Sequence, residues 1–495
     1  MLIAIDAGTT GVTTLLFDER LGVVASATRD FRQHFPAPGL VEHDAREILA
    51  AVDATLAEVV RDPRARGAVA IGITNQRETV FALERATGKP LANGIVWQDR
   101  RTADDCARWR AEGREPAVRA TTGLVVDPYF SGSKIRWLLR NVQGLAARAR
   151  RGEVVFATVE SLVHHHLVRA EWRTDTTNAS RTLLFDIERR AWSRELCDWL
   201  GVEPDWLPTV SAPRADHGRT DPTVCGVALP VFGLVGDQQS ALLGQGAVEP
   251  GAAKNTYGTG CFLLVQSGAR RPRAVDGFLT TLACDAYGDS SFALEGSLFM
   301  GGAIVQWLRD GLGIISDAAE SEALAASVPD SGGVTLVPGF AGLGAPYWDA
   351  DARGALLGLS RGTTRAHIAR AALEAIALEN AELIELVRVG TDLPIRELVV
   401  DGGAAANDLL MQMQADFAGT TILRPDDVEA TARGAAVLAG LGAGLWERAD
   451  AVPRPPVRRF EPQVPAPARR ERLAAWRAAV ARTLTRDRNA PGGSN

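Results

Sequence analysis

The pattern of apolar and polar positions predicts the same supersecondary unit twice, about half a chain apart. Residues 2–17 contain a short apolar run, a polar glycine-flanked tip of sequence DAGTTG and a second apolar run, an order that predicts a β-hairpin. Residues 253–266 repeat this order around the tip YGTG. Two short hairpins can match by chance, but we interpret the repeat as an internal duplication with two related halves that meet near residue 246.

The segments between the hairpins alternate between helical and strand-like spacing. Residues 45–60, 103–112 and 365–388 place apolar side chains at the three- and four-residue intervals of helices. Residues 68–73 form a short apolar run that predicts a buried strand. This alternation favours an α/β architecture.

The last sixty residues predict a helix, an extended segment and a second helix. Residues 434–446 are rich in Gly and Ala and too short to span a bilayer, so a packed helix is expected. Residues 453–467 are rich in Pro and are expected to be extended or linker-like. Residues 473–484 have the spacing of a final helix, and a frayed tail is expected from 486.

Composition narrows the class of protein. A chain of 495 residues with 46% hydrophobic and 23% charged residues is typical of a globular protein of two or three domains. A net charge of −6 argues against a broad nucleic-acid surface. Five scattered cysteines without a CxxC motif and a start without a basic segment favour a cytoplasmic protein with neither disulfide framework nor secretory signal. We expect no integral association with a membrane.

The two hairpin tips have residues suited to phosphate. Glycine allows close backbone approach, and exposed N–H groups and Thr hydroxyls donate to phosphate oxygens, although a plain surface turn explains either tip alone. Asp6 precedes the first tip and could hold a magnesium ion through water. A predicted strand also leads into Asp401-Gly402-Gly403 and a helix from about residue 407, a turn compatible with a nucleotide. The sequence has no GxxxxGK[ST] motif, and no GxGxxG follows the first strand.

Two polar clusters follow predicted buried strands. Asp237 follows the apolar run 231–235, where it could accept a proton from a substrate hydroxyl or act as the N-cap of the next helix. Arg77 and Glu78 offer a donor fork and an acceptor that suit a small polyol, or they form an exposed ion pair.

Aromatic and histidine residues are less specific. Aromatic residues beside turns could wall a pocket or belong to the core: Trp97, Tyr129 and Phe262. The tract 164–166 contains three consecutive histidines, which point in different directions on a helix and do not predict a zinc site.

Several longer motifs resemble the FGGY family of carbohydrate kinases. In chain order they are ITNQRET (73–79), VDPYFSGSKIRW (126–137), TNASRT (177–182), GDQQSAL (236–242), KNTYGTGCF (254–262), GLGAPYWD (342–349) and VDGGAAAN (400–407). Residues 129–141 and 354–374 resemble the two signatures of the family. Within the family, the motifs are most similar to those of the members that phosphorylate glycerol.

The resemblance implies two actin-like (ribonuclease H-like) ATPase domains, at 1–245 and 246–495, with the active site in the cleft between them. It implies ATP-dependent phosphorylation of glycerol to sn-glycerol 3-phosphate with Mg²⁺, and a homodimer or homotetramer. Asp237 would be the general base, and Asp6 would position magnesium. Glycerol would be held by Arg77, Glu78, Trp97, Tyr129, Asp237, Gln238 and Phe262. The nucleotide would be bound by Thr9, Thr10, Gly11, Thr13, Thr259, Gly302, Gln306, Gly403 and Asn407.

The first hairpin departs from the family pattern. Glycerol-phosphorylating members usually have Gln, Ser and Arg where this chain has Ala7, Gly11 and Thr13. The missing Arg removes a cationic phosphate contact. Two alternatives stay open: a kinase for another small polyol or a ketose, and a non-catalytic actin-like nucleotide sensor. The departures in the first hairpin support only the sensor.

Overall fold

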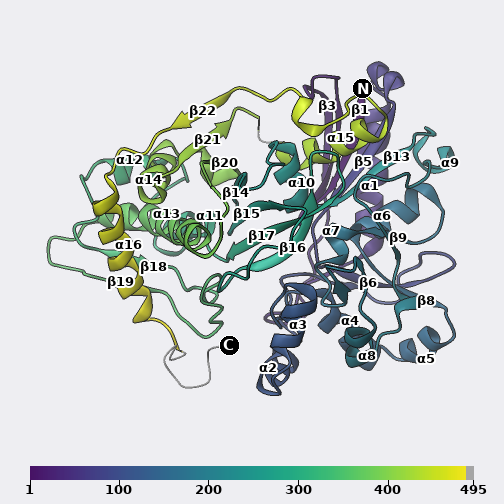
Figure 1. The fold of residues 1–495 in the computed structure, drawn as a ribbon, viewed down its shortest axis with the longest axis horizontal. Helices are drawn as coiled ribbons and strands as arrows, with labels where there is room; N and C mark the ends of the chain where they lie inside the picture. Colours follow the sequence, from purple (N-terminus) through teal and green to yellow (C-terminus); the bar gives the residue numbers. More distant parts are fainter. Residues whose placement is uncertain (428, 486–495) are drawn as a thin grey trace.

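The computed structural model describes residues 1–427 and 429–485, which form two α/β bodies side by side (Figure 1). The first body contains a five-stranded sheet in the order β13-β5-β1-β2-β3. Its strands are β1 (Leu2–Ala7), β2 (Gly11–Phe17), β3 (Val23–Asp30), β5 (Ala70–Asn75) and β13 (Val231–Gly236). β1 to β3 form an antiparallel meander, whereas β5 and β13 run parallel to β1.

Helices cover both faces of this sheet. Ile3 and Ile5 of β1 pack in one core cluster with α1 (Ala45–Val60) and α6 (Val159–Val168), whereas Leu2 and Ala4 pack with α15 (Ala430–Gly442). Alternate residues of a strand point to opposite faces, so β1 is covered on both sides. This explains why its sequence is a continuous apolar run.

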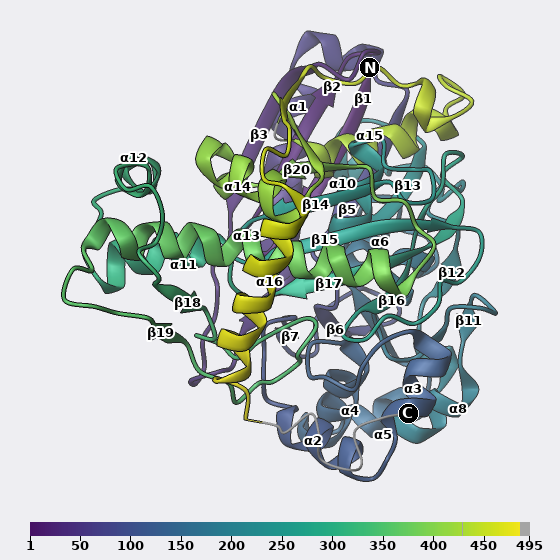
Figure 2. The same cartoon turned by 60° about the vertical axis from the view of Figure 1, so that its left-hand side comes forward.

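The second body contains a seven-stranded sheet in the order β16-β17-β15-β14-β20-β21-β22. Its strands are β14 (Ala253–Tyr257), β15 (Cys261–Gly268), β16 (Leu279–Cys284), β17 (Ser290–Leu298), β20 (Glu397–Asp401), β21 (Thr421–Pro425) and β22 (Val457–Phe460). The helices α13 (Arg365–Gly390), α14 (Asp408–Ala418) and α16 (Ala466–Ala481) pack with them, and Figure 2 shows α16 crossing α13.

The two predicted hairpins occupy equivalent places in the two sheets. β1 pairs antiparallel with β2 and parallel with β5, just as β14 pairs antiparallel with β15 and parallel with β20. The repeated unit is therefore confirmed as a repeat of topology. The boundary at residue 245 stays a prediction, because α15 of the second half packs on the sheet of the first.

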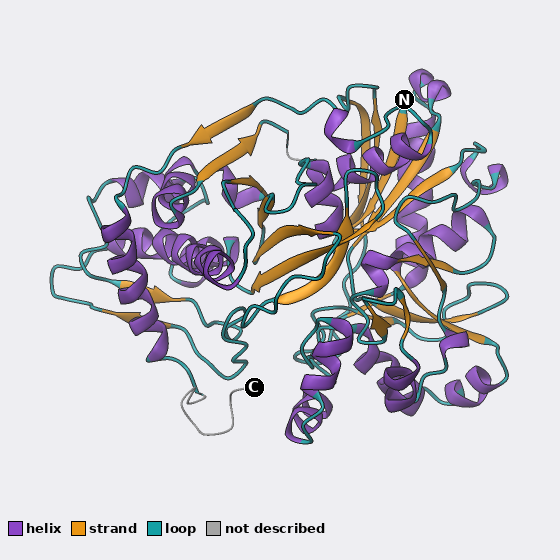
Figure 3. Ribbon diagram, in the orientation of Figure 1, coloured by secondary structure: helices purple, strands orange, loops and turns teal. Residues whose placement is uncertain are grey.

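A smaller four-stranded sheet lies below the first body, in the order β4-β7-β6-β8. It consists of β4 (Glu42–His43), β6 (Val80–Glu84), β7 (Gly94–Ile95) and β8 (Val154–Thr158), with α4 (Ser131–Asn141) against β6. Figure 3 shows the strands of the two large sheets converging near the centre of the molecule. There β16 contacts α7 (Thr176–Ala179) and α10 (Asp237–Gly244) of the first half.

The C-terminal predictions differ in outcome. The Gly- and Ala-rich segment is the packed helix α15, and no helix in residues 1–427 and 429–485 is long and apolar enough to cross a membrane. Within the Pro-rich segment, residues 457–460 are extended, as expected, but they are not a free linker because they pair with β21 as an edge strand. The last helix begins at Ala466, with Pro467 in its first turn, which is seven residues earlier than expected. The predicted tail lies outside the described residues.

Candidate functional site

A small cavity brings together all the residues predicted to hold a polyol. It has a volume of about 50 Å³ and is lined by Thr9, Arg77, Glu78, Trp97, Tyr129, Asp237, Gln238 and Phe262. Arg77 and Glu78 follow β5, and Asp237 follows β13. These two strands are parallel and end at the same edge of the sheet. Phe262 lies on β15, so both halves of the chain contribute to the cavity.

The backbone at Glu78 is held in an uncommon conformation. Glu78 has φ +63°, in the left-handed region that side chains other than glycine rarely adopt. The Ser131 hydroxyl donates to the Glu78 carbonyl at 2.9 Å, and the Thr79 N–H donates to the Arg77 carbonyl at 2.8 Å. Such conformations persist where surrounding contacts hold them, and they cluster at functional sites.

Asp237 has the environment of a proton acceptor. Its carboxylate is 27% exposed and lies 3.3 Å from the Arg77 Nε, and its Oδ1 accepts from the Gln238 N–H at 2.6 Å. Burial raises the pKa of Asp237, while Arg77, the Gln238 N–H and Lys254 oppose that shift. A carboxylate in this setting can take a proton from a hydroxyl bound in the cavity.

Aromatic side chains wall the cavity. The rings of Trp97 and Tyr129 meet edge to face with centroids 5.7 Å apart, and the Trp97 Nε1 donates to the Thr9 hydroxyl at 3.0 Å. The predicted pocket wall is therefore present, and Thr9 connects it to the tip of the first hairpin.

Lys254 was not predicted to belong to the site. Its ammonium is buried on β14 and donates to the Gln238 Oε1 and, at 2.7 Å, to the Thr256 hydroxyl. Burial lowers the pKa of Lys254 to about 8, against the opposing effect of Asp401 and Asp237. The sequence signal for Lys254 was a lysine within a strand of mostly buried residues. It does not identify the partner Gln238, which is distant in the sequence.

The sequence also missed Arg181 and Glu295. Both are fully buried, and both contact the cavity-lining pair of Arg77 and Glu78. Glu295 lies at the centre of β17, in which every residue is buried. A charged residue in such a strand requires a partner of opposite charge. The local sequence pattern does not show which residue that partner is.

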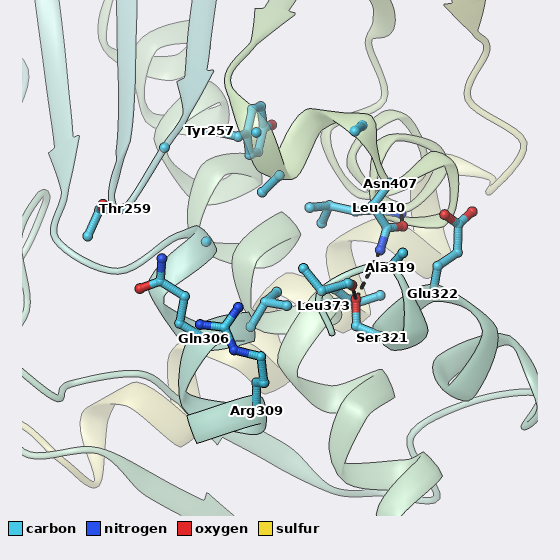
Figure 4. A pocket seen from close by; sticks show the side chains of 17 residues that line it. Tyr257, Thr259, Gln306, Arg309, Ala319, Ser321, Glu322, Leu373, Asn407 and Leu410 are labelled. Atoms are coloured by element: carbon cyan, nitrogen blue, oxygen red, sulfur yellow. Dashed lines mark hydrogen bonds between the residues drawn. The ribbon is translucent and has the colours of Figure 1, made fainter. Parts of the chain in front are cut away.

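A larger cavity lies in the second half of the chain (Figure 4). Its volume of about 560 Å³ is in the range of small-molecule sites. Its lining includes five of the residues predicted to bind nucleotide, Thr259, Gly302, Gln306, Gly403 and Asn407. The lining also includes side chains that were not predicted, among them Arg309, Ser321 and Glu322.

Two contacts shape this cavity. Asn407 caps α14 by accepting from the Leu410 N–H at 2.8 Å, and its amide nitrogen lies 3.5 Å from the Ser321 hydroxyl. A Cβ at Gly302 would lie 2.9 Å from the Gly258 carbonyl oxygen. Glycine therefore allows the start of α11 (Gly302–Gln306) to approach the second hairpin tip closely.

Three residues predicted to bind nucleotide line neither cavity. They are Thr10, Gly11 and Thr13. The Thr13 hydroxyl hydrogen-bonds with that of Thr28 at 3.0 Å. A Cβ at Gly11 would lie 2.8 Å from the Asp30 Oδ1 and 2.9 Å from the Arg29 carbonyl oxygen, so β2 and β3 leave little room for a side chain at this position.

Asp6 is suited to a divalent cation. Burial, the Asp237 charge and the Glu429 charge raise the pKa of Asp6 to about 8. Such repulsion between carboxylates is relieved when a cation binds. The described residues contain no cluster of three His, Cys, Asp or Glu side chains that could hold a metal ion. A bound ion would therefore need water and phosphate oxygens, which is the coordination that Mg²⁺ prefers.

The three consecutive histidines have separate partners. His164 and His165 donate to the carbonyls of His217 and Ala170 at 2.7 and 2.8 Å, and the His166 Nε2 lies 2.7 Å from the Asp53 carboxylate. Their side chains support local structure at three different places.

Two family models match the chain. The FGGY family of carbohydrate kinases, N-terminal domain, matches residues 1–244, and the C-terminal domain of the same family matches residues 253–443. A glycerol kinase from Methylibium petroleiphilum is 51% identical, covering 98% of this chain and 99% of that protein. A glycerol kinase from Ralstonia nicotianae is 50% identical, covering 97% of each.

Solved structures give the same picture. Glycerol kinase from Plasmodium falciparum with ADP matches with a TM-score of 0.92 and 33% identity over 98% of this chain and 99% of that one. A xylulose kinase from Lactobacillus acidophilus matches with a TM-score of 0.88 at 21% identity, covering 97% and 98%, and shows a shared fold alone. The expected two-domain actin-like fold is confirmed.

Proposed function

Because this chain belongs to the FGGY family of carbohydrate kinases, we propose that it transfers the γ-phosphate of ATP to a terminal hydroxyl of glycerol. The products are sn-glycerol 3-phosphate and ADP. The observation that carries this proposal is the small cavity, in which Asp237 lies beside Arg77 and Glu78. The identity of about 50% to glycerol kinases over nearly the whole chain supports it.

The size and polarity of the cavity support a three-carbon polyol. A volume of about 50 Å³ favours a small substrate over a large one. Arg77, Glu78 and Gln238 offer donors and acceptors to the hydroxyls, while Trp97 and Phe262 cover the carbon skeleton. A cavity of this size also leaves little space for water, which would otherwise compete as the nucleophile.

Asp237 is proposed as the general base. Its carboxylate accepts the hydroxyl proton as that oxygen attacks the γ-phosphorus, and the bond to the β–γ bridging oxygen breaks as ADP leaves. Arg77 holds the carboxylate in place through its Nε at 3.3 Å. Catalysis then depends mainly on positioning and on electrostatic stabilisation.

The nucleotide is proposed to bind in the larger cavity. Thr259, Gly302 and Gly403 lie where the backbone can approach phosphates closely. Gln306 and Asn407 shape the wall of the cavity. Thr9, Thr10, Gly11 and Thr13 belong to the first hairpin and are proposed to meet the terminal phosphates from the opposite side.

Magnesium is the proposed cofactor, and Asp6 is the residue that would hold it. When bound, the ion neutralises charge on the phosphate oxygens. The raised pKa of Asp6, which burial, Asp237 and Glu429 cause, supports this assignment.

The test is ADP release from magnesium-ATP with glycerol, dihydroxyacetone, erythritol, ribulose, xylulose or no added substrate. We expect turnover with glycerol and weaker turnover with dihydroxyacetone. Faster turnover with ribulose or xylulose would show that the substrate is a ketose and not glycerol. Absence of turnover from folded protein that binds ATP would favour the nucleotide sensor. The homodimer or homotetramer and the cytoplasmic location stay predictions, and light scattering would measure the former.

A further inference from the structure

Four buried charged side chains join the two halves of the chain next to the small cavity. Arg77, Glu78 and Arg181 come from the first half, and Glu295 comes from β17 in the second. Their side chains are at most 2% exposed. Of these four residues, only Arg77 and Glu78 line the cavity. Arg181 and Glu295 therefore lie behind the residues that would touch the substrate.

We propose that Arg181 and Glu295 are positioning residues, which fix the Arg77 guanidinium and the Glu78 carboxylate in the orientation that recognises the hydroxyls of the substrate. This proposal rests on the proposed function, since it deepens the role of the same cavity. It also makes the substrate site depend on one carboxylate from the second half of the chain.

Glu295 fixes the plane of the Arg77 guanidinium. Its Oε2 accepts from the Arg77 Nη1 at 2.6 Å, and its Oε1 accepts from the Nη2 at 3.1 Å. Two parallel hydrogen bonds of this kind set both distance and orientation. They leave the Arg77 Nε directed toward Asp237, at 3.3 Å. Burial raises the pKa of Glu295, but the charges of Arg181 and Arg77 outweigh that effect and hold the pKa at about 2.

Arg181 performs the same task for Glu78. Its Nε donates to the Glu78 Oε1 at 2.6 Å, and its Nη2 donates to the Glu295 Oε1 at 2.9 Å. With Oε1 engaged, Oε2 is the oxygen left to accept a hydrogen bond from a hydroxyl in the cavity. Burial raises the pKa of Glu78, and Arg77 and Arg181 oppose that shift.

Arg181 also supports the aromatic wall of the cavity. Its guanidinium carbon lies 5.6 Å from the ring centroid of Tyr129 and 5.2 Å from that of Phe130. Its Nη1 is buried without a hydrogen-bond partner among the described residues. Contact with two ring faces offsets part of the cost of burying this cation.

Each guanidinium of the group has a carboxyl partner. Glu295 contacts both Arg77 and Arg181, so its removal leaves two buried guanidinium groups without that partner. Without Glu295, the Arg77 guanidinium would turn toward the remaining carboxylates, Asp237 and Glu78. The guanidinium would then leave the position in which it lines the cavity.

The experiment measures both Michaelis constants for Glu295→Gln and Arg181→Lys. Each variant is expected to raise the KM for glycerol at least about tenfold and to lower kcat/KM about 100-fold, a loss typical of misplaced substrate-positioning groups. The KM for ATP should change less than about twofold, because the nucleotide cavity has a separate lining. A merely structural role would lower the active fraction and leave both KM values unchanged, which would overturn the proposal.

Glu379→Gln is the matched control. Glu379 is a buried carboxyl on α13 that lines neither cavity, and burial together with the nearby Glu382 raises its pKa well above the usual range. The control should keep both KM values. If Glu295→Gln does not fold, Ser297→Ala removes a single hydrogen bond of 3.1 Å to the Glu295 Oε1. It should raise the KM for glycerol about twofold to fivefold, and an unchanged KM would count against the proposal.

A crystal structure of the Glu295→Gln variant separates this proposal from the proposed function. We expect the Arg77 guanidinium to leave its place beside residue 295 and to pair with Asp237. An Arg77 guanidinium that keeps its position overturns the positioning role, whatever the substrate is. Lack of glycerol turnover by the unaltered protein would overturn the proposed function alone.

Discussion

At the scale of single residues, Asp6 is a half-buried carboxyl group whose pKa is affected by two other acidic residues, Asp237 and Glu429. Its pKa is raised to about 8 by burial, Asp237 and Glu429, whereas the unfolded chain has an Asp pKa of about 3.9. The folded state therefore binds a proton more tightly than the unfolded state. Stability is lost as the pH rises from about 4 through 8, and the loss is complete above the folded pKa.

Asp6→Asn should remove this pH dependence. In EDTA and at pH 8.5 the variant should be more stable than the unaltered protein by on the order of 2 kcal/mol, and the difference should shrink toward pH 5. Thermal unfolding at the two pH values measures it. A variant that loses stability equally at both pH values would show that Asp6 is not under electrostatic strain.

Thr13→Arg should improve the use of ATP. Thr13 pairs with Asp6 in the register of β1 and β2, so both side chains lie on one face of the sheet. A guanidinium there would add a charge-assisted hydrogen bond to phosphate. We expect the KM for ATP to fall severalfold and the KM for glycerol to stay unchanged.

Thr28→Arg is the matched control, because Thr28 faces Thr13 from β3 and lies one strand farther from Asp6. This control variant should leave the KM for ATP and the KM for glycerol unchanged. An unaltered KM for ATP in Thr13→Arg would mean that another residue already replaces the missing cation.

The residues that line the cavities were predictable, whereas the residues behind them were not. Asp237 and Arg77 follow apolar strands in motifs that resemble a known family, so their place could be inferred. Arg181 and Glu295 act through partners more than a hundred residues away. Local spacing carries no information about such contacts.

At the scale of elements, α15 shows how glycine sets the distance between a helix and its neighbours. A Cβ at Gly434 would lie 1.9 Å from the Ser240 carbonyl oxygen, and one at Gly72 would lie 2.0 Å from the Ala435 carbonyl oxygen. The helix therefore touches α10 and β5 through backbone atoms. This close packing explains why the helix is rich in Gly and Ala.

Gly434→Ala should destabilise the protein. Helix propensity predicts a gain of up to about 1 kcal/mol for this change, whereas overpacking predicts a loss of about 2 kcal/mol. We expect the loss to dominate because the blocking atom belongs to the backbone of α10. The midpoint of urea unfolding shows directly whether the substitution raises or lowers the stability of the protein.

Gly362→Ala serves as the control for this substitution, since the nearest atom to its Cβ, the Ser360 Oγ, is 3.7 Å away. Its midpoint should not change. A higher midpoint for Gly434→Ala would show that α15 can move away from α10 at no cost.

Local elements were predictable where the pattern is continuous. α1 begins at Ala45 and ends at Val60, as its spacing predicted. β22 was missed as a strand because its pairing with β21 joins segments about thirty-five residues apart, and flanking prolines dominate its local pattern.

At the scale of the whole molecule, two repeated sheets meet at a site that neither completes alone. Arg77 and Asp237 follow strands of the first sheet, whereas Phe262 and Glu295 lie on strands of the second. The order of the strands depends on pairings between distant segments. Composition and periodicity predicted an α/β protein with related halves, and the arrangement of those halves followed only from the resemblance to a family.

The most direct test of the account is the product formed from glycerol and magnesium-ATP, identified by phosphorus NMR. The unaltered protein should form sn-glycerol 3-phosphate, and Asp237→Asn should lower the rate about 10²- to 10⁴-fold while ATP binding is kept. Asp198→Asn, at a side chain that is 54% exposed, should behave as the unaltered protein. Absence of glycerol 3-phosphate, or an Asp237→Asn variant within about tenfold of full activity, would contradict the account.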